Sequence, residues 1–326
     1  MNRPVRIGVL GCADFALRRM LPAMARSADI ELVAVASRNA DKARDAALTF
    51  RCRPVHGYEA LLARDDIDGV YIPLPAALHA EWTRAALRAG KHVLAEKPLS
   101  TDAHTTAELL RLAEARRLAL MENVLFVRHS QHDTVRRLIR LGTIGQLRSF
   151  HVEFTVPPRP ETDIRLRADL GGGALGDTGI YPVRAALHFL GADLTVEAAV
   201  LVHGDGRPVD TSGSVLLTTP GGVTAQLSFG LDHGYRSRYE LVGSHGRLTV
   251  DRAFTPPADQ APSVLLEHGP DTERLALAPD DQVANALFAF ASTVRSPGPP
   301  EQEPLLEARL LDAIRTTARQ IKEDAP

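Results

Sequence analysis

The sequence predicts an α/β protein in which a doubly wound parallel sheet is followed by an α+β domain built on an open, largely antiparallel sheet. Three observations support this fold class. Up to residue 123, short apolar runs alternate with helical patterns, as in parallel strands joined by crossover helices. After residue 123, strand patterns follow one another through glycine-containing turns. The length of 326 residues also exceeds what one hydrophobic core usually supports, so we expect two domains, 1–123 and 124–326.

The first part contains five apolar runs that we interpret as buried parallel strands. They are Val5–Leu10, Ile30–Ala36, Asp68–Pro73, Lys91–Ala95 and Leu118–Val124. Helical patterns separate them: one that places Leu17, Leu21 and Met24 on one face, one that Asn39 can cap, Ala76–Ala89 and Asp102–Arg116. Strands separated by helices of this length predict a parallel sheet with helices on both faces.

After residue 123, the regular alternation of predicted strands and helices ends. We expect a helix over Ser130–Leu141, a strand over Gln146–Val156, and a helix that follows Gly171-Gly172-Gly173 and runs to about Leu190. Several strands are expected between Thr195 and Leu277, with a hairpin at Gly221-Gly222. Two helices, Gln282–Val294 and Leu305–Ile321, are predicted to end the chain.

Composition excludes several classes of protein. The net charge of −2 gives no nucleic-acid footprint, and no apolar run approaches the ~20 residues that span a membrane. Cys12 and Cys52 are too few for a disulfide framework, so we expect a reduced, cytoplasmic setting. His129, His132 and Asp133 have a spacing that suits a metal, but no second cluster supplies further ligands, and we predict no metal site.

A candidate cofactor loop lies between the first strand and the first helix. It reads Gly11-Cys12-Ala13-Asp14-Phe15-Ala16, a degenerate form of the G-x-G-x-x-G/A fingerprint of dinucleotide-binding folds. The first glycine allows the tight turn, the middle residue must let the backbone approach a pyrophosphate, and the third small residue packs helix on strand. The alternative is a plain strand-to-helix turn, but the position of the loop favours cofactor binding.

The end of the second strand indicates which dinucleotide binds. Sites for NAD usually place a carboxylate here, whereas this chain reads Ser37-Arg38 and has no acid before Asp41. A hydroxyl and a guanidinium suit the 2′-phosphate of NADP(H), because arginine pairs bidentately with phosphate oxygens. The alternative is that Arg38 is a solvated residue at a helix start.

Glu96-Lys97-Pro98 follows a predicted buried strand. Ligands of open α/β sheets bind beyond the carboxyl ends of the strands, so Lys97 is expected to reach the ligand crevice. The chain has only four lysines against 34 arginines, which makes a generic surface role for Lys97 less attractive. Taken alone, the tripeptide also fits a strand end with a solvated pair of charges.

Together, the Gly11 loop, Glu96-Lys97-Pro98 and the run from Gly171 to Tyr181 resemble the Gfo/Idh/MocA oxidoreductases over essentially the whole chain. The resemblance implies a Rossmann domain and an open-sheet domain through which homodimers or homotetramers form. It also implies that Lys97 lies beside the nicotinamide, and the lysine at this position of the family often precedes a cis proline. It places Asp177 and Tyr181 in the same cleft. Its remaining implied cofactor contacts are Leu74, Pro75, His79, Glu96, Pro98 and Arg165.

Most of that family carries histidine where this chain has Tyr181, and the tyrosine resembles the nucleotide-sugar 3-ketoreductases. The resemblance therefore implies NADPH-dependent reduction of a keto group, at C3, on a dTDP-linked keto-deoxysugar. A phenol can supply the proton that the alkoxide needs, and an ammonium ~4 Å away would stabilise the phenolate by ~4 kcal/mol, a role for Lys97. Asp177, at i to i+4, is expected to orient Tyr181 or a substrate hydroxyl. The alternatives are an NADP-dependent dehydrogenase of a free sugar or dihydrodiol, and a binding protein without catalysis.

Overall fold

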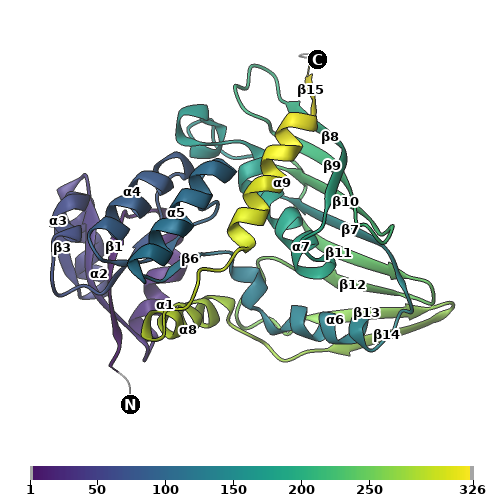
Figure 1. Ribbon diagram of the computed structural model, residues 1–326, viewed down its shortest axis with the longest axis horizontal. Helices are drawn as coiled ribbons and strands as arrows, with labels where there is room; N and C mark the ends of the chain where they lie inside the picture. The colour runs from purple at the N-terminus through teal and green to yellow at the C-terminus, as the bar shows by residue number, and fades with distance from the viewer. Residues whose placement is uncertain (1–2, 324–326) are drawn as a thin grey trace. The chain divides into compact units, whose positions relative to one another are not determined.

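The computed structural model describes residues 3–323 and divides into two compact units, each of which is described here by itself (Figure 1). The first unit extends to Val124 and also takes in Val283–Pro304. The second comprises Leu125–Gln282 and the chain from Leu305 onward. The division differs from the two continuous segments expected from the sequence, because the chain returns once to the first unit.

The first unit is built on a six-stranded parallel sheet with the strand order β3-β2-β1-β4-β5-β6. Its strands are β1 (Val5–Leu10), β2 (Ile30–Ser37), β3 (Arg53–His56), β4 (Gly69–Ile72), β5 (His92–Ala95) and β6 (Leu120–Glu122). The helices are η1 (Ala16–Met20, a π-helix), α1 (Leu21–Arg26), α2 (Ala40–Phe50), α3 (Tyr58–Leu62), α4 (Ala76–Arg88), α5 (Ala103–Arg116) and α8 (Gln282–Arg295). The strand order reverses between β1 and β4, which places a ligand crevice at their carboxyl ends.

The predicted doubly wound sheet is confirmed, and so is the cap of α2, where the Asn39 side chain accepts the N–H groups of Asp41 and Lys42. Two elements were missed, β3 and α3. Strand β3 lies at the sheet edge with Arg53, Pro54 and His56 exposed, so it has no apolar run to reveal it.

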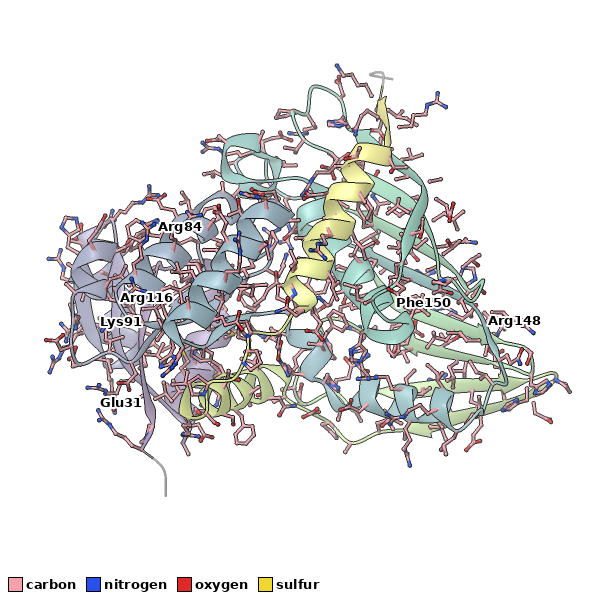
Figure 2. All side chains as sticks on the ribbon, viewed as in Figure 1. Glu31, Arg84, Lys91, Arg116, Arg148 and Phe150 are labelled. Atoms are coloured by element: carbon pink, nitrogen blue, oxygen red, sulfur yellow. The ribbon has the colours of Figure 1, made fainter. Side chains whose placement is uncertain are left out.

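Two polar side chains tie distant segments of the first unit together. Lys91, labelled in Figure 2, is buried and donates from Nζ to the backbone carbonyls of Arg64 (2.6 Å) and Ile67 (2.9 Å). On α8, the Arg295 guanidinium donates to Asp29 Oδ1 at 2.7 Å, next to the start of β2. This bond is one of the contacts that hold α8 in the first unit.

The second unit is built on a nine-stranded sheet with the order β14-β13-β12-β11-β7-β10-β9-β8-β15. Its strands are β7 (Leu147–Thr155), β8 (Thr195–His203), β9 (Ser212–Thr218), β10 (Thr224–Gly230), β11 (Arg236–Gly243), β12 (Arg247–Asp251), β13 (Ser263–His268), β14 (Asp271–Ala276) and β15 (Arg319–Lys322). The helices are η2 (Leu125–Arg128), α6 (Ser130–Arg140), η3 (Ile164–Leu166), η4 (Ala168–Leu170), η5 (Leu175–Gly179, a π-helix), α7 (Ile180–Leu190) and α9 (Glu303–Thr317). Pairing is antiparallel except between β10 and β7 and between β15 and β8, which confirms the expected mostly antiparallel sheet.

The two faces of this sheet differ. On β7, Phe150, Val152 and Phe154 are buried on the face that α7 covers, whereas His151 and Glu153 alternate with them and are partly exposed. The hairpin at Gly221-Gly222 is confirmed by the antiparallel pairing of β9 with β10.

The prediction of a final helix to Ile321 was wrong beyond Thr317. Residues 319–322 instead form β15, which pairs in parallel with β8, with Ile321 opposite Val202. The edge of β8 offers backbone hydrogen bonds to this segment, and that tertiary pairing overrides the local helical pattern.

Candidate active site

The turn after β1 has the geometry that a dinucleotide loop needs. Gly11 has φ +118°, in the region that favours glycine, and its N–H donates to the carbonyl of Ala36 at 2.9 Å. A Cβ on Gly11 would lie 2.9 Å from Leu74 Cδ2, so a larger residue here would have to displace the Leu74 side chain as well as adopt a strained backbone conformation. Helical hydrogen bonding begins with the Leu17 N–H and the carbonyl of Ala13. The predicted loop therefore has a glycine turn that opens a helix, as a bound pyrophosphate requires.

The side chains predicted to select the cofactor lie at the carboxyl end of β2. Ser37 is buried, its Oγ accepts the N–H of Asn39 at 3.1 Å, and its hydroxyl also forms a hydrogen bond with the Cys12 thiol. Arg38 is exposed, and its backbone carbonyl is 3.1 Å from His56 Nε2. Burial raises the pKa of Tyr58, while the Arg38 guanidinium beside it acts in the opposite direction. This guanidinium thus lies at a strand end, where a 2′-phosphate would be met.

The Gly11 loop also carries a thiol, Cys12, and an aromatic ring, Phe15, and neither side chain has the surroundings of a catalytic group. Cys12 Sγ is 3.6 Å from the carbonyl of Lys42, and burial raises the pKa of its thiol, which favours the unreactive protonated form. Phe15 is among the exposed large apolar side chains.

The Lys97 segment is held from both neighbouring strands. The Lys97–Pro98 peptide is cis, as the family resemblance implied. Glu96 Oε1 accepts the Tyr71 hydroxyl at 2.8 Å and Asn123 Nδ2 at 2.6 Å, and burial raises the pKa of this carboxyl. These contacts fix the backbone on the N-terminal side of Lys97.

The C-terminal side of Lys97 is held in a similar way. Glu122, on β6, accepts the N–H of Leu99 at 2.7 Å. His79, on α4, is buried with both ring nitrogens 2.6 Å from backbone carbonyls, those of Pro98 and Leu74. The His79 ring is therefore occupied within the first unit, a role that sequence reasoning did not anticipate.

In the second unit, a carboxylate that the sequence analysis missed supports the helix that carries the predicted catalytic residues. Asp210 Oδ2 accepts the N–H of Leu175 at 2.6 Å, and its backbone carbonyl accepts the N–H of Ala174. Gly173 has φ +118°, and a Cβ there would lie 2.5 Å from Asp210 Oδ1. Asp210 lies far along the chain from this helix, so no local pattern could have revealed its role.

Asp177 is paired with the arginine that the family resemblance placed near the cofactor. Arg165 Nε donates to Asp177 Oδ2 at 2.6 Å, and Arg165 Nη1 donates to Asp163 Oδ1 at 3.2 Å. The two carboxylates, Asp177 foremost, raise the pKa of Arg165. Residues 175–179 form a π-helix that leads into α7, so Asp177 and Tyr181 lie on either side of the change from π-helical to α-helical hydrogen bonding. Their shared face stays a prediction.

Tyr181 lies near the start of α7 within a group of aromatic rings. Its ring centroid is 4.5 Å from that of Phe154, 5.7 Å from Phe254 and 6.1 Å from Phe126. Rings at these separations restrict the orientation of the phenol, which is partly exposed. Each unit therefore assembles part of the predicted site: Gly11, Leu74, His79, Glu96 and Lys97 in the first, and Arg165, Asp177 and Tyr181 in the second.

The histidines considered as metal ligands have other contacts. His132 Nδ1 lies 3.0 Å from the Tyr239 hydroxyl, and its Nε2 lies 3.0 Å from the carbonyl of Ala253. Within residues 3–323, no three His, Cys, Asp or Glu side chains lie close enough to hold a metal ion. No helix in the same range is long and apolar enough to cross a membrane.

Both units resemble known proteins. The "Oxidoreductase family, NAD-binding Rossmann fold" description of the GFO/IDH/MocA family matches residues 5–124, and the "GFO/IDH/MocA C-terminal domain" matches residues 132–249. A dTDP-3,4-didehydro-2,6-dideoxy-alpha-D-glucose 3-reductase of Streptomyces violaceoruber is 52% identical over 332 aligned positions, gaps included, which cover 98% of this chain and 97% of that protein. The D-xylose 1-dehydrogenase (NADP(+)) 2 of Haloferax volcanii is 34% identical over 319 residues, 95% of this chain and 96% of that protein.

Among solved structures, that of a 3-ketoreductase from Actinomadura kijaniata in complex with NADP and TDP-benzene superimposes with a TM-score of 0.96. Its identity is 51%, over 98% of this chain and 100% of that one. Because the family descriptions match both units and the identities extend over nearly the full length, the chain belongs to the GFO/IDH/MocA oxidoreductase family.

Proposed function

We propose that this protein is an NADPH-dependent 3-ketoreductase that acts on a dTDP-linked keto-deoxysugar. The observation that carries the proposal is identity above 50%, over nearly all of both chains, to reductases named for that substrate and to a 3-ketoreductase solved with NADP and TDP-benzene. Solved variants of the Actinomadura enzyme replace a lysine and a tyrosine that are separated by the same number of positions as Lys97 and Tyr181. This spacing supports the assignment of the same two roles here.

The first unit offers groups that fit NADPH, which when bound would supply the hydride. The Gly11 turn opens a helix towards the pyrophosphate, and Ser37 and Arg38 offer a hydroxyl and a guanidinium to the 2′-phosphate. We assign the remaining residues of the loop to the same site, namely Cys12, Ala13, Asp14, Phe15 and Ala16. Leu74 and Pro75 line the neighbouring turn.

Tyr181 is proposed to give its phenolic proton to the oxygen of the reduced carbonyl. An ammonium stabilises the phenolate that remains, and Lys97, on a segment pinned by Glu96 and Pro98, is the group assigned to that role. Asp177 is proposed to accept a hydrogen bond from a substrate hydroxyl while Arg165 holds its carboxylate in place.

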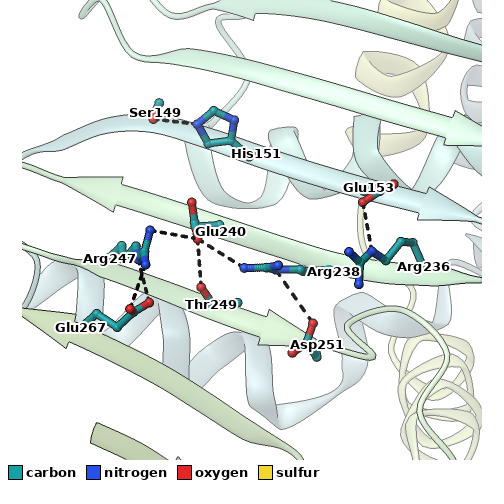
Figure 3. A network of polar contacts seen from close by, with 10 residues as sticks. All are labelled: Ser149, His151, Glu153, Arg236, Arg238, Glu240, Arg247, Thr249, Asp251 and Glu267. Atoms are coloured by element: carbon teal, nitrogen blue, oxygen red, sulfur yellow. Dashed lines mark hydrogen bonds and ion pairs between the residues drawn. The ribbon is translucent and has the colours of Figure 1, made fainter. Parts of the chain in front are cut away.

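The oligomer is proposed to form through the outer face of the nine-stranded sheet. Figure 3 shows this face of β7, β11, β12 and β13, where Glu240 contacts Arg238 (3.4 Å) and Arg247 (4.0 Å), and Arg247 also contacts Glu267 (2.6 Å). A surface that carries both signs of charge can pair with a second copy of itself, as a symmetric homodimer or homotetramer requires. Arg236 and Arg238 belong to this face, which makes them poor candidates for binding the substrate diphosphate.

The alternative with a specific observation in its favour is an NADP-dependent dehydrogenase of a free sugar, because the xylose dehydrogenase is 34% identical. Two measurements distinguish the 3-ketoreductase from the free-sugar dehydrogenase. They are NADPH oxidation with a panel of dTDP-keto-sugars, and binding of thymidine diphosphate to the NADPH complex. We expect turnover in the first and measurable binding in the second. Absence of both, together with steady oxidation of xylose or a dihydrodiol by NADP, would favour the dehydrogenase.

The proposed roles are tested by Lys97→Ala and Tyr181→Phe. Each should lower kcat by ~10²–10⁴-fold, the usual value of general acid catalysis, and Tyr181→Phe should bind NADPH normally. A Tyr181→Phe protein with most of its kcat would assign the proton donor elsewhere.

A further inference from the structure

We propose that His79 is a positioning residue that fixes Lys97 relative to the Gly11 turn by joining the backbones of two loops. Its kinetic consequence rests on the proposed function, because the residue it positions is Lys97. We call the link that His79 makes between the two loops the joint, and it depends only on contacts within the first unit.

The contacts of His79 reach two separate loops. Nδ1 lies 2.6 Å from the carbonyl oxygen of Pro98, the residue that follows Lys97. Nε2 lies 2.6 Å from the carbonyl oxygen of Leu74, in the loop between β4 and α4. The side chain is 1% exposed, so water has little access to compete for these bonds.

The second of these loops continues to the cofactor turn. Leu74 lies against Gly11, close enough that a Cβ on Gly11 would meet its Cδ2 at 2.9 Å. His79 therefore connects the loops that follow β4 and β5, and through Leu74 the turn that follows β1. These are the strand ends at which the proposed hydride donor and Lys97 must be placed relative to each other.

The protonation state of the ring decides how many of these contacts are hydrogen bonds. A carbonyl oxygen can only accept, so a neutral imidazole bonds to one carbonyl, and the full joint between the two loops needs a proton on both ring nitrogens. The charged groups that act on the ring are Lys97, which disfavours the second proton, and Glu122, which favours it. Burial lowers the pKa of His79, while the carbonyls of Pro98 and Leu74 raise it, because each accepts a bond from a protonated ring nitrogen.

The test compares His79→Leu, which fills the site but donates nothing, with His79→Gln, whose amide can donate to a carbonyl. Thr83→Val is the matched control, because Thr83 is fully buried on the same helix and its hydroxyl has no hydrogen-bond partner among the described residues. We expect His79→Leu to lower kcat by about 10–100-fold, as a small misplacement of a reacting group does, with KM for the sugar nucleotide nearly unchanged. His79→Gln should recover most of that loss, and Thr83→Val should match the unmodified protein.

Equal impairment of the Leu and Gln variants, or full kcat in His79→Leu, would overturn the proposal. A measurement without substrate separates its failure from that of the proposed function. In protein labelled with ¹⁵N-histidine, the ring N–H that disappears in His79→Gln should exchange slowly with water, because it is buried and bonded. Rapid exchange of that proton would refute the joint even in an active reductase, and slow exchange would support it even if no keto-sugar were reduced.

Discussion

The ion pair between Arg184 on α7 and Glu307 on α9 is predicted to be among the most sensitive contacts of the second unit. Arg184 Nε lies 2.7 Å from Glu307 Oε2, and the two side chains are 5% and 1% exposed. Removal of one partner of a buried pair leaves the other charge without compensation, which typically costs about 3–5 kcal/mol. Glu307→Leu and Arg184→Met should each lower the free energy of unfolding by about that amount.

The double variant, Arg184→Met with Glu307→Leu, distinguishes the pair from simple packing. Because both charges are removed together, it should be much more stable than either single variant, and similar buried pairs have been replaced with a neutral or favourable effect. Asp312→Asn provides the exposed control on the same helix, since its pair with Arg315 is more than a third exposed and should contribute less than about 1 kcal/mol.

Urea unfolding of the four proteins, read as a double-mutant cycle, gives the coupling energy directly. With about 2–4 °C per kcal/mol for domains of 150–250 residues, each single variant should also lose roughly 10 °C in melting temperature. Single variants that lose less than about 1 kcal/mol would show that the pair behaves like a surface contact. A double variant whose loss equals the sum of the single losses would refute the coupling.

Three further predictions follow from individual groups. Arg38→Ala should raise KM for NADPH well above that for NADH, and unmodified protein that binds both cofactors equally would contradict the assignment. Burial raises the pKa of Glu96, so the folded protein holds the carboxyl proton more tightly than the unfolded chain does. The free energy of unfolding should therefore fall as pH rises from about 4.5 through the raised pKa. Glu96→Gln, which can still accept both hydrogen bonds, should remove this dependence. Burial lowers the pKa of His188 to about 4 and that of His132 well below its ordinary range, so the unfolded chain takes up protons on these rings before the folded protein does. The free energy of unfolding should therefore fall as pH drops below about 6.5. His188→Gln should reduce this fall, and an unchanged dependence on pH would contradict the prediction.

The order and type of most elements could be read from the sequence. Strands β1, β4 and β5 are buried on both faces, so they appear as apolar runs, and Asn39 marks the start of α2 by a side-chain cap that acts within three residues. The Gly11 turn and the position of Lys97 at a strand end were predictable for the same reason, because a turn and a strand end are local features. The π-helix that carries Asp177 was not, since its hydrogen bonds span five residues instead of four and its composition is that of an α-helix.

Tertiary structure alone decided the contacts between segments that are distant in the sequence. Strand β15 forms because the edge of β8 offers it hydrogen bonds, and α8 packs with the first unit beside Asp29. The supports of the candidate site are of the same kind: Asp210 holds the start of the helix before Tyr181, and His79 bridges Leu74 and Pro98. A carboxylate or an imidazole acquires such a role only when folding removes it from water and brings a particular backbone group within hydrogen-bond distance, and no local pattern records that event.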